Sequence, residues 1–228
     1  MRTVLIGGGT LKSTKLFNRI MIRMSHKKNP KVLFIGTASN DSNEYYLEVK
    51  DAFTRLGCSV DNLSLVTNNY SEKELDSIFD VDIIYIGGGD TVFMLNKWHE
   101  CGIDKRILDI LYQDKAVVGG LSAGCGVFFK YIYSDSNGKI IKDGSFRMQK
   151  MLGVYDGILC PHYNNPLRKN FSLDLVNYDY KGLALEDEVA FVNEDSKYYL
   201  VRSRRDAKAF CFTYKEGKLV KDELSFLE

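Results

Sequence analysis

Short apolar runs alternate with longer segments of helical periodicity in the first half of the chain, and this alternation limits the fold more than any other feature. The apolar runs are residues 3–6, 32–35, 83–86 and 116–118, and helical spacing marks residues 17–24, 47–56, 75–79 and 107–111. Such short apolar runs, bounded by glycine, are typical of buried strands. Strands joined by helices need right-handed crossovers, which produce a mainly parallel sheet. We therefore expect an α/β fold with a doubly wound sheet.

Glycine clusters follow three of these expected strands, at residues 7–9, at Gly36 and at residues 87–89. In open α/β sheets, ligands bind outside the carboxyl ends of the strands. We therefore expect the functional site at this edge of the sheet.

The chain changes character after about residue 182. Strand-like runs at residues 189–192, 198–202, 207–214 and 218–221 are separated by polar turns. This pattern predicts antiparallel strands that extend one edge of the sheet, complete the core and carry no chemistry. The sequence contains no internal repeat and no Pro/Ser-rich linker, so we expect residues 1–228 to form one domain.

Charge and composition exclude several classes of protein. The chain has 31 Lys+Arg against 30 Asp+Glu, so nothing favours nucleic acid as a partner. The longest uncharged stretch, residues 116–129, is too short and too rich in glycine to span a membrane. The first apolar run ends too soon for a signal peptide, and five scattered cysteines do not suggest a disulfide framework. We expect a cytoplasmic protein with no membrane or nucleic-acid partner.

The most specific local pattern is Gly120-Leu-Ser-Ala-Gly124, which stands between an apolar strand and a segment suited to a helix. This is the G-x-S-x-G nucleophile elbow in its strand–turn–helix context. A tight turn exposes the serine hydroxyl, and the helix N-terminus directs backbone N–H groups at the reacting oxygen. The pattern predicts Ser122 as the nucleophile, with the Ala123 N–H as an oxyanion donor. A glycine-rich turn that only packs closely is the structural alternative.

A serine nucleophile needs a base, and the sequence offers three histidines. His26 stands beside lysines near a helix end, and His99 stands at a helix C-terminus, so surface or packing roles suit both. His162 follows the apolar run Ile158-Leu-Cys-Pro directly and is the candidate base.

The third member of the expected triad stays open between two regions. Asp135 stands thirteen residues after Ser122, and the elbow helix would have to stop by about residue 131 for its carboxylate to return. A solvated turn residue is the alternative for Asp135. The reserve candidates, which follow another short strand, are Glu186, Asp187 and Glu188.

A second glycine-rich turn, residues 87–89, ends one expected strand and opens an apolar helix at Asp90 and Thr91. Its N–H groups could form half of an oxyanion hole. A phosphate cradle is less favoured because neither G-x-x-x-x-G-K-[ST] nor G-x-G-x-x-G is present. A loop that only lets two helices start close together is the other alternative.

Two further groups of residues suggest no chemistry of their own. Cys125, Cys160 and His162 lack the paired spacing of a metal site, so no metal is expected. Four basic residues are expected to form a solvent-exposed turn at the edge of the fold: Arg202, Arg204, Arg205 and Lys208.

Residues 86–91, 120–124 and 160–162, in this order, resemble the dipeptidase E and cyanophycinase family of serine peptidases, within the class I glutamine amidotransferase-like superfamily. The resemblance extends from the first strand to about Val192. It implies a three-layer, flavodoxin-like or amidotransferase-like α/β fold with antiparallel C-terminal strands. It also implies a cofactor-free cytoplasmic hydrolase, often dimeric. Its nucleophile would be Ser122 and its base His162, with Gly88, Gly89 and Ala123 as oxyanion donors.

The resemblance also suggests how substrate is held. It points to Asp90 and Thr91 as substrate contacts, and to an arginine that holds the substrate carboxylate, for which Arg168 is the nearest candidate. A surface arginine in the first turn of a helix is the alternative for Arg168. Where dipeptidase E has a Thr-Thr-Asn-Asp-type segment, this chain has Tyr133-Ser-Asp-Ser136, which leaves specificity for N-terminal Asp open.

The expected function is that of a serine peptidase which hydrolyses short peptides through an acyl-enzyme, dipeptides with N-terminal Asp among them. Two alternatives stay open. One is a non-catalytic protein that binds a small ligand on the same fold, and the other is a hydrolase of a non-peptide amide or ester.

Overall fold

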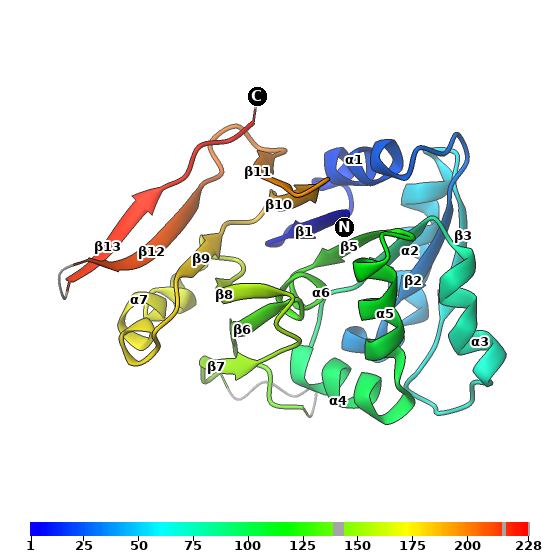
Figure 1. Ribbon diagram of the computed structural model, residues 1–228, viewed down its shortest axis with the longest axis horizontal. Coiled ribbons are helices and arrows are strands. Elements are labelled where there is room, and N and C mark those ends of the chain that lie inside the picture. Colours follow the sequence, from blue (N-terminus) through cyan, green and yellow to red (C-terminus); the bar gives the residue numbers. More distant parts are fainter. Residues whose placement is uncertain (139–143, 216–217, 228) are drawn as a thin grey trace.

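Two β-sheets organise the protein, as the computed structural model shows for residues 1–138, 144–215 and 218–227 (Figure 1). In this described part, the first sheet has the order β11-β10-β1-β5-β4-β2-β3. Its strands are β1 (Thr3–Ile6), β2 (Lys31–Ile35), β3 (Ser59–Leu63), β4 (Ile83–Ile86), β5 (Val117–Leu121), β10 (Val189–Glu194) and β11 (Lys197–Arg202). The first five run parallel, and β10 and β11 add an antiparallel edge beside β1.

The second sheet has the order β13-β12-β9-β8-β6-β7 within the described residues. Its strands are β6 (Phe129–Ser134), β7 (Arg147–Lys150), β8 (Tyr155–Cys160), β9 (Gly182–Leu185), β12 (Ala209–Lys215) and β13 (Lys218–Glu223). Strands β6, β8 and β9 run parallel, whereas β7, β12 and β13 are antiparallel to their neighbours. Of the tail strands expected to extend the parallel sheet, only β10 and β11 do so. The expectation was wrong for β12 and β13, because β12 pairs with β9.

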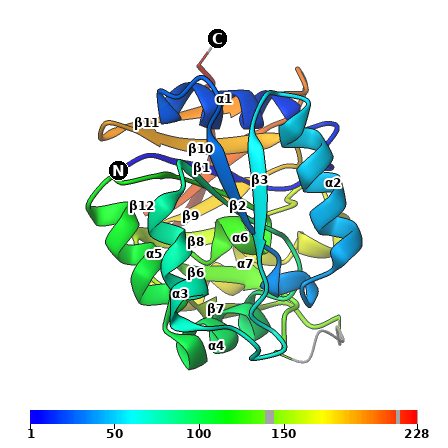
Figure 2. The same ribbon diagram turned by 90° about the vertical axis from the view of Figure 1, so that its right-hand side faces the viewer.

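Helices cover both faces of the first sheet, which confirms the predicted α/β class. Helices α1 (Lys15–Ser25) and α2 (Asn43–Thr54) cover one face, and α3 (Glu72–Asp76), α4 (Thr91–Cys101) and α5 (Ile103–Tyr112) the other. Figure 2 shows α2 on one side of β2 and β3, with α3 and α5 on the opposite side. The short helices are α6 (Ala123–Gly126), α7 (Phe171–Asp174), η1 (Thr37–Ser39), η2 (Ser77–Asp80), η3 (Pro166–Arg168) and η4 (Leu175–Asn177). No helix among the described residues is long and apolar enough to cross a bilayer.

The central strands are apolar throughout because both of their faces are buried. In β4, Ile83 and Tyr85 pack towards α1 and α2, whereas Ile84 and Ile86 pack towards α4 and α5. The hydrophobic cluster on the face of α4 and α5, which contains Ile84 and Ile86, also contains residues of the second sheet, such as Ile132 and Leu159. The two sheets therefore share a hydrophobic core, while the division into domains stays a prediction.

The segment after Ser122 is helical only briefly. Helix α6 ends at Gly126, and the chain enters β6 at Phe129. The run Phe128-Phe-Lys-Tyr-Ile-Tyr is rich in aromatic residues, which favour strands over helices. The chain therefore leaves the first sheet at the elbow and begins the second sheet directly.

Candidate active site

Ser122 stands at the carboxyl end of β5 in a strained backbone conformation, with φ 53° and ψ −101°. Its N–H donates to the Ile6 carbonyl oxygen at 2.9 Å, which fixes the turn against the end of β1. A Cβ on Gly120 would overlap the backbone of Gly124, and one on Gly124 would overlap the Ile86 carbonyl. The two glycines of the G-x-S-x-G pattern are thus needed for close backbone packing around the serine.

His162 lies between a hydroxyl and a carboxylate. Its Nε2 is 2.8 Å from Ser122 Oγ, and its Nδ1 is 2.6 Å from Asp187 Oδ1. The residue follows β8, and its N–H donates to the Gly7 carbonyl oxygen at 3.1 Å. An imidazole held in this way can accept the serine proton at Nε2, because the carboxylate keeps the other proton on Nδ1.

Asp187, rather than Asp135, is the carboxylate beside the imidazole. Both ring nitrogens of His162 are engaged, by Ser122 and Asp187, and Asp135 makes neither contact. Asp187 belongs to the loop between β9 and β10, where the chain crosses from the second sheet to the first. The reserve candidates included this residue. The expectation that the region after residue 182 only completes the core was wrong, because this region supplies the carboxylate beside His162.

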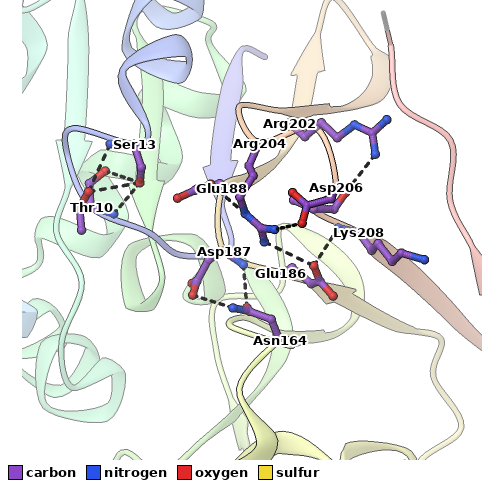
Figure 3. A network of polar contacts seen from close by, with 11 residues as sticks. Thr10, Ser13, Asn164, Glu186, Asp187, Glu188, Arg202, Arg204, Asp206 and Lys208 are labelled. Atoms are coloured by element: carbon purple, nitrogen blue, oxygen red, sulfur yellow. Dashed lines mark hydrogen bonds and ion pairs between the residues drawn. The ribbon is translucent and has the colours of Figure 1, made fainter.

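Asn164 holds the Asp187 carboxylate from the other side (Figure 3). Its Nδ2 donates to Asp187 Oδ2 at 3.0 Å, and its Oδ1 accepts from the Asp187 N–H at 2.9 Å. Burial by itself would raise the pKa of Asp187. Hydrogen bonds from His162 and Asn164, with the positive charges of His162 and Arg168, outweigh burial and lower this pKa below its usual value. Asp187 is therefore held as an ionised hydrogen-bond acceptor.

Arg204 binds the acidic residues on both sides of Asp187 (Figure 3). Its guanidinium lies 3.1 Å from Glu188 Oε2 and 3.8 Å from Glu186 Oε2, and a third contact joins it to Asp206 at 2.7 Å. The backbone of the loop is fixed as well, because the Glu188 N–H donates to the Gly8 carbonyl oxygen at 2.9 Å. The basic turn expected to be a solvated edge therefore helps to hold the loop that carries Asp187.

Gly8 is a site residue that the sequence analysis did not single out. A Cβ at this position would overlap both the Asp187 carboxylate and the His162 ring. Only glycine lets the end of β1 pass so close to this pair. The signal was present in the sequence, as the cluster of glycines that follows the first strand.

A cavity of about 400 Å³ lies over the nucleophile, lined among the described residues by Gly9, Thr10, Leu11, Tyr45, Glu48, Gly88, Gly89, Leu121, Ser122 and His162. Gly88 is adjacent to the serine, since a Cβ on it would lie 3.4 Å from Ser122 Cβ. Its N–H donates to the Tyr45 hydroxyl at 3.3 Å. No described residue accepts from the N–H groups of Gly89 and Ala123. Tyr45 and Glu48, which α2 contributes, had no recognisable signal in the sequence.

The three residues expected to contact substrate do not line this cavity. Asp90 is 3% exposed and caps α4, accepting from the Phe93 N–H at 2.8 Å. The Thr91 N–H donates to Ser136 Oγ at 3.0 Å.

Arg168 is 6% exposed, donates at Nη1 to the Tyr133 carbonyl oxygen at 2.5 Å and stacks over Phe146. The structure thus gives Asp90, Thr91 and Arg168 buried contacts that hold helix α4 and strand β6. Within the described residues, no group of three or more His, Cys, Asp or Glu side chains could hold a metal ion.

Comparison with known proteins identifies the family. The family model of peptidase family S51 matches residues 3–201. The chain belongs to this peptidase family. This confirms the resemblance to peptidase E that the three motifs suggested, and it makes the protein a member of a serine peptidase family.

Individual relatives agree with this assignment. The chain is 32% identical to the uncharacterized peptidase YgaJ of Bacillus subtilis (strain 168), over 90% of this chain and 87% of YgaJ. It is 26% identical to a probable alpha-aspartyl dipeptidase of Drosophila melanogaster, over 59% of this chain and 53% of that protein. The crystal structure of a peptidase from an acI-B1 Actinobacterium has the same fold, with a TM-score of 0.71 at 18% identity, and the match covers 100% of this chain and 95% of that structure.

Proposed function

We propose that this protein is a serine peptidase that hydrolyses short peptides, with Ser122 as nucleophile, His162 as general base and Asp187 as the acid of the triad. The observation that carries the proposal is the continuous chain of hydrogen bonds from Ser122 Oγ through the His162 ring to the Asp187 carboxylate, at 2.8 and 2.6 Å. These contacts have the lengths that proton transfer in such a triad needs.

The first half of the reaction forms an acyl-enzyme. His162 Nε2 takes the proton of Ser122 Oγ while Oγ bonds to the scissile carbonyl carbon, and the carbonyl π electrons move to its oxygen. Asp187 stabilises the resulting imidazolium through Nδ1. When the carbonyl re-forms, the C–N bond breaks, and the imidazolium gives its proton to the leaving amine.

Water completes the cycle in the same geometry. His162 Nε2 takes a proton from a water molecule as the water oxygen attacks the acyl carbon. The imidazolium then returns this proton to Ser122 Oγ as the ester bond breaks, which releases the carboxylic acid product.

Backbone N–H groups next to Ser122 would stabilise the oxyanion. We assign this role to Gly89 and Ala123, because no described residue accepts from their N–H groups. The Gly88 N–H is adjacent but donates to the Tyr45 hydroxyl, so it joins the oxyanion hole only if Tyr45 moves. Each such donor contributes about a hundredfold to a thousandfold in kcat.

The substrates that we propose are short peptides, dipeptides included, because a cavity of about 400 Å³ holds only a few residues. A dipeptidase specific for N-terminal Asp is the narrower option, and the description of the Drosophila relative favours it. The described lining of the cavity, however, contains no Lys or Arg to bind an aspartate side chain. The proposed function therefore does not require an N-terminal Asp, and dipeptides with N-terminal Asp are tested beside other dipeptides.

The test is intact mass after incubation with a fluorophosphonate, combined with hydrolysis of a dipeptide panel, on wild type and Ser122→Ala. We expect a single adduct on the wild type, no adduct on the variant, and a loss of hydrolysis of at least about a thousandfold. Near-full hydrolysis by Ser122→Ala would show that Ser122 is not the nucleophile. A protein that only binds small ligands would form no adduct and show thermal shifts with free amino acids.

A further inference from the structure

Helix α2 brings a carboxylate to the cavity that contains the nucleophile. Glu48 lines this cavity together with Ser122 and His162, and it is exposed, so a bound substrate can reach it. Tyr45, three residues earlier, lies on the same face of the helix and accepts the hydrogen bond from Gly88. Burial raises the pKa of the Tyr45 hydroxyl, and the negative charge of Glu48 raises it further. The carboxylate is therefore close to the backbone that adjoins Ser122.

Among the described residues Glu48 forms no ion pair, unlike Asp51 and Asp187. Asp51, on the same helix, pairs with Arg55 at 2.7 Å, and Asp187 is engaged by His162 and Asn164. No described residue forms a hydrogen bond or ion pair with Glu48, and the described lining of the cavity contains no Lys or Arg. An unpaired carboxylate of this kind attracts positive charge to the site.

A second cavity continues from the first along α1 and α2. It shares Thr10, Leu11 and Glu48 with the cavity of the nucleophile, has a volume of about 640 Å³, and is further lined by Lys12, Lys15, Asp51, Ala52 and Arg55. Lys12 and Lys15 line only this second cavity. Glu48 therefore stands at the junction of the two cavities, and besides His162 it is the one acidic or basic side chain in the described lining of the cavity that contains Ser122.

We infer that Glu48 determines specificity by binding a positively charged group on the residue that carries the scissile carbonyl. This group is either the free α-ammonium or a Lys or Arg side chain. The inference rests on the proposed peptidase function and adds the substrate class to it. Because Glu48 is exposed, its effect is modest, about two- to fivefold in rate at limiting substrate.

The test uses four α-aminoalkyl diphenyl phosphonates, which form a covalent bond with an activated serine. They carry a lysine or a norleucine side chain, each with a free or an acetylated amino group. The rate of adduct formation, followed by intact mass, is measured for wild type, Glu48→Gln and Glu44→Gln. Glu44 is the matched control, because it is an exposed acid in the first turn of α2 that does not line the cavity.

We expect the charged probes to react about two- to fivefold faster than their neutral counterparts with wild type and Glu44→Gln, and this preference to disappear in Glu48→Gln. Preference for the lysine side chain identifies a side-chain subsite, and preference for the free amino group identifies an α-ammonium subsite. A neutral fluorophosphonate should react equally with all three proteins.

The remaining outcomes separate the two proposals. Three outcomes contradict the role of Glu48 while the fluorophosphonate still reacts: the charge of the probe has no effect, the charged probes do not react, or the preference remains in Glu48→Gln. In each of these cases the proposed peptidase function is retained. If no probe reacts with folded wild type, Ser122 is not an activated nucleophile, and both the proposed peptidase function and the role of Glu48 are wrong.

Discussion

Two aspartates competed for the place beside His162, and their surroundings explain which one takes it. Asp187 has the imidazole on one oxygen and the Asn164 amide on the other, at 2.6 and 3.0 Å. Asp135, although closer to Ser122 in sequence, follows β6 in the second sheet and does not contact the ring. The identity of the acid is therefore a property of tertiary structure.

Substitution of the two aspartates tests this difference directly. Asp187→Asn removes the negative charge that stabilises the imidazolium and favours the wrong tautomer, so kcat/KM should fall by about a thousandfold to ten-thousandfold. Asp135→Asn should change kcat/KM by no more than a few fold. Steady-state hydrolysis of one dipeptide by both variants checks this, and the reverse order of effects would return the role to Asp135.

The residues found from sequence were those with a local signature. Ser122 lies in a five-residue pattern, and His162 follows an apolar strand, so both could be predicted. Gly8 and Asp187 could not be assigned, because their proximity depends on how β1, β8 and the loop after β9 meet. Asp90, Thr91 and Arg168 were expected to contact substrate but do not line the cavity that contains Ser122. Asp90 and Thr91 stand in the second glycine-rich motif, and Arg168 is the nearest arginine after His162, but their side chains or N–H groups form hydrogen bonds with buried groups.

At the scale of elements, the loop between β9 and β10 is held in place by a residue from another connection. Arg204 lies between β11 and β12 and contacts Glu186 and Glu188, the neighbours of Asp187 on each side. Arg205, the next residue, is exposed and has no ion pair among the described residues. The adjacent pair of arginines thus provides a variant and its control.

Arg204→Met should loosen the loop and misplace Asp187, which lowers kcat by about three- to tenfold with KM nearly unchanged, because the substrate cavity is intact. Arg204→Lys should restore part of the loss, since a lysine can still pair with one of the acids. Arg205→Met should have no effect. Equal kcat values for Arg204→Met and Arg205→Met would show that the clamp does not position the acid.

At the scale of the whole molecule, the site lies where the two sheets meet. Ser122 follows β5 of the first sheet, His162 follows β8 of the second, and Asp187 lies in the loop that joins β9 to β10. The first sheet could be largely predicted, because strands buried on both faces give unbroken apolar runs. The second could be predicted only in part, because the runs that form β12 and β13 were expected as strands, whereas β7 is short, polar and exposed at the edge. β3 was missed for the same reason.

This position between the sheets ties the ionisation of the site to the stability of the fold. The pKa of Asp187 is below its usual value of 3.8, because hydrogen bonds from His162 and Asn164 outweigh the effect of burial. A carboxyl whose pKa is lower in the folded state stabilises the protein above its unfolded pKa, and this contribution is lost as the pH falls through the folded value. The pKa values of Asp114 and Glu194 are lowered as well, because Arg2 and the N-terminal ammonium outweigh burial at Asp114 and Arg23 binds Glu194 directly.

The free energy of unfolding should therefore be lower below about pH 4 than near pH 6, and part of this dependence belongs to Asp187. In Asp187→Asn, stability near pH 6 should be reduced, and the difference from wild type should shrink as the pH falls below 3.8. Urea unfolding at a series of pH values between 3 and 6 measures both quantities. Asp41 is the opposite control, because burial raises its pKa, and Asp41→Asn should not reduce the acid dependence. A difference between wild type and Asp187→Asn that grows on acidification would mean that the carboxylate is not stabilised by the contacts that hold it beside His162.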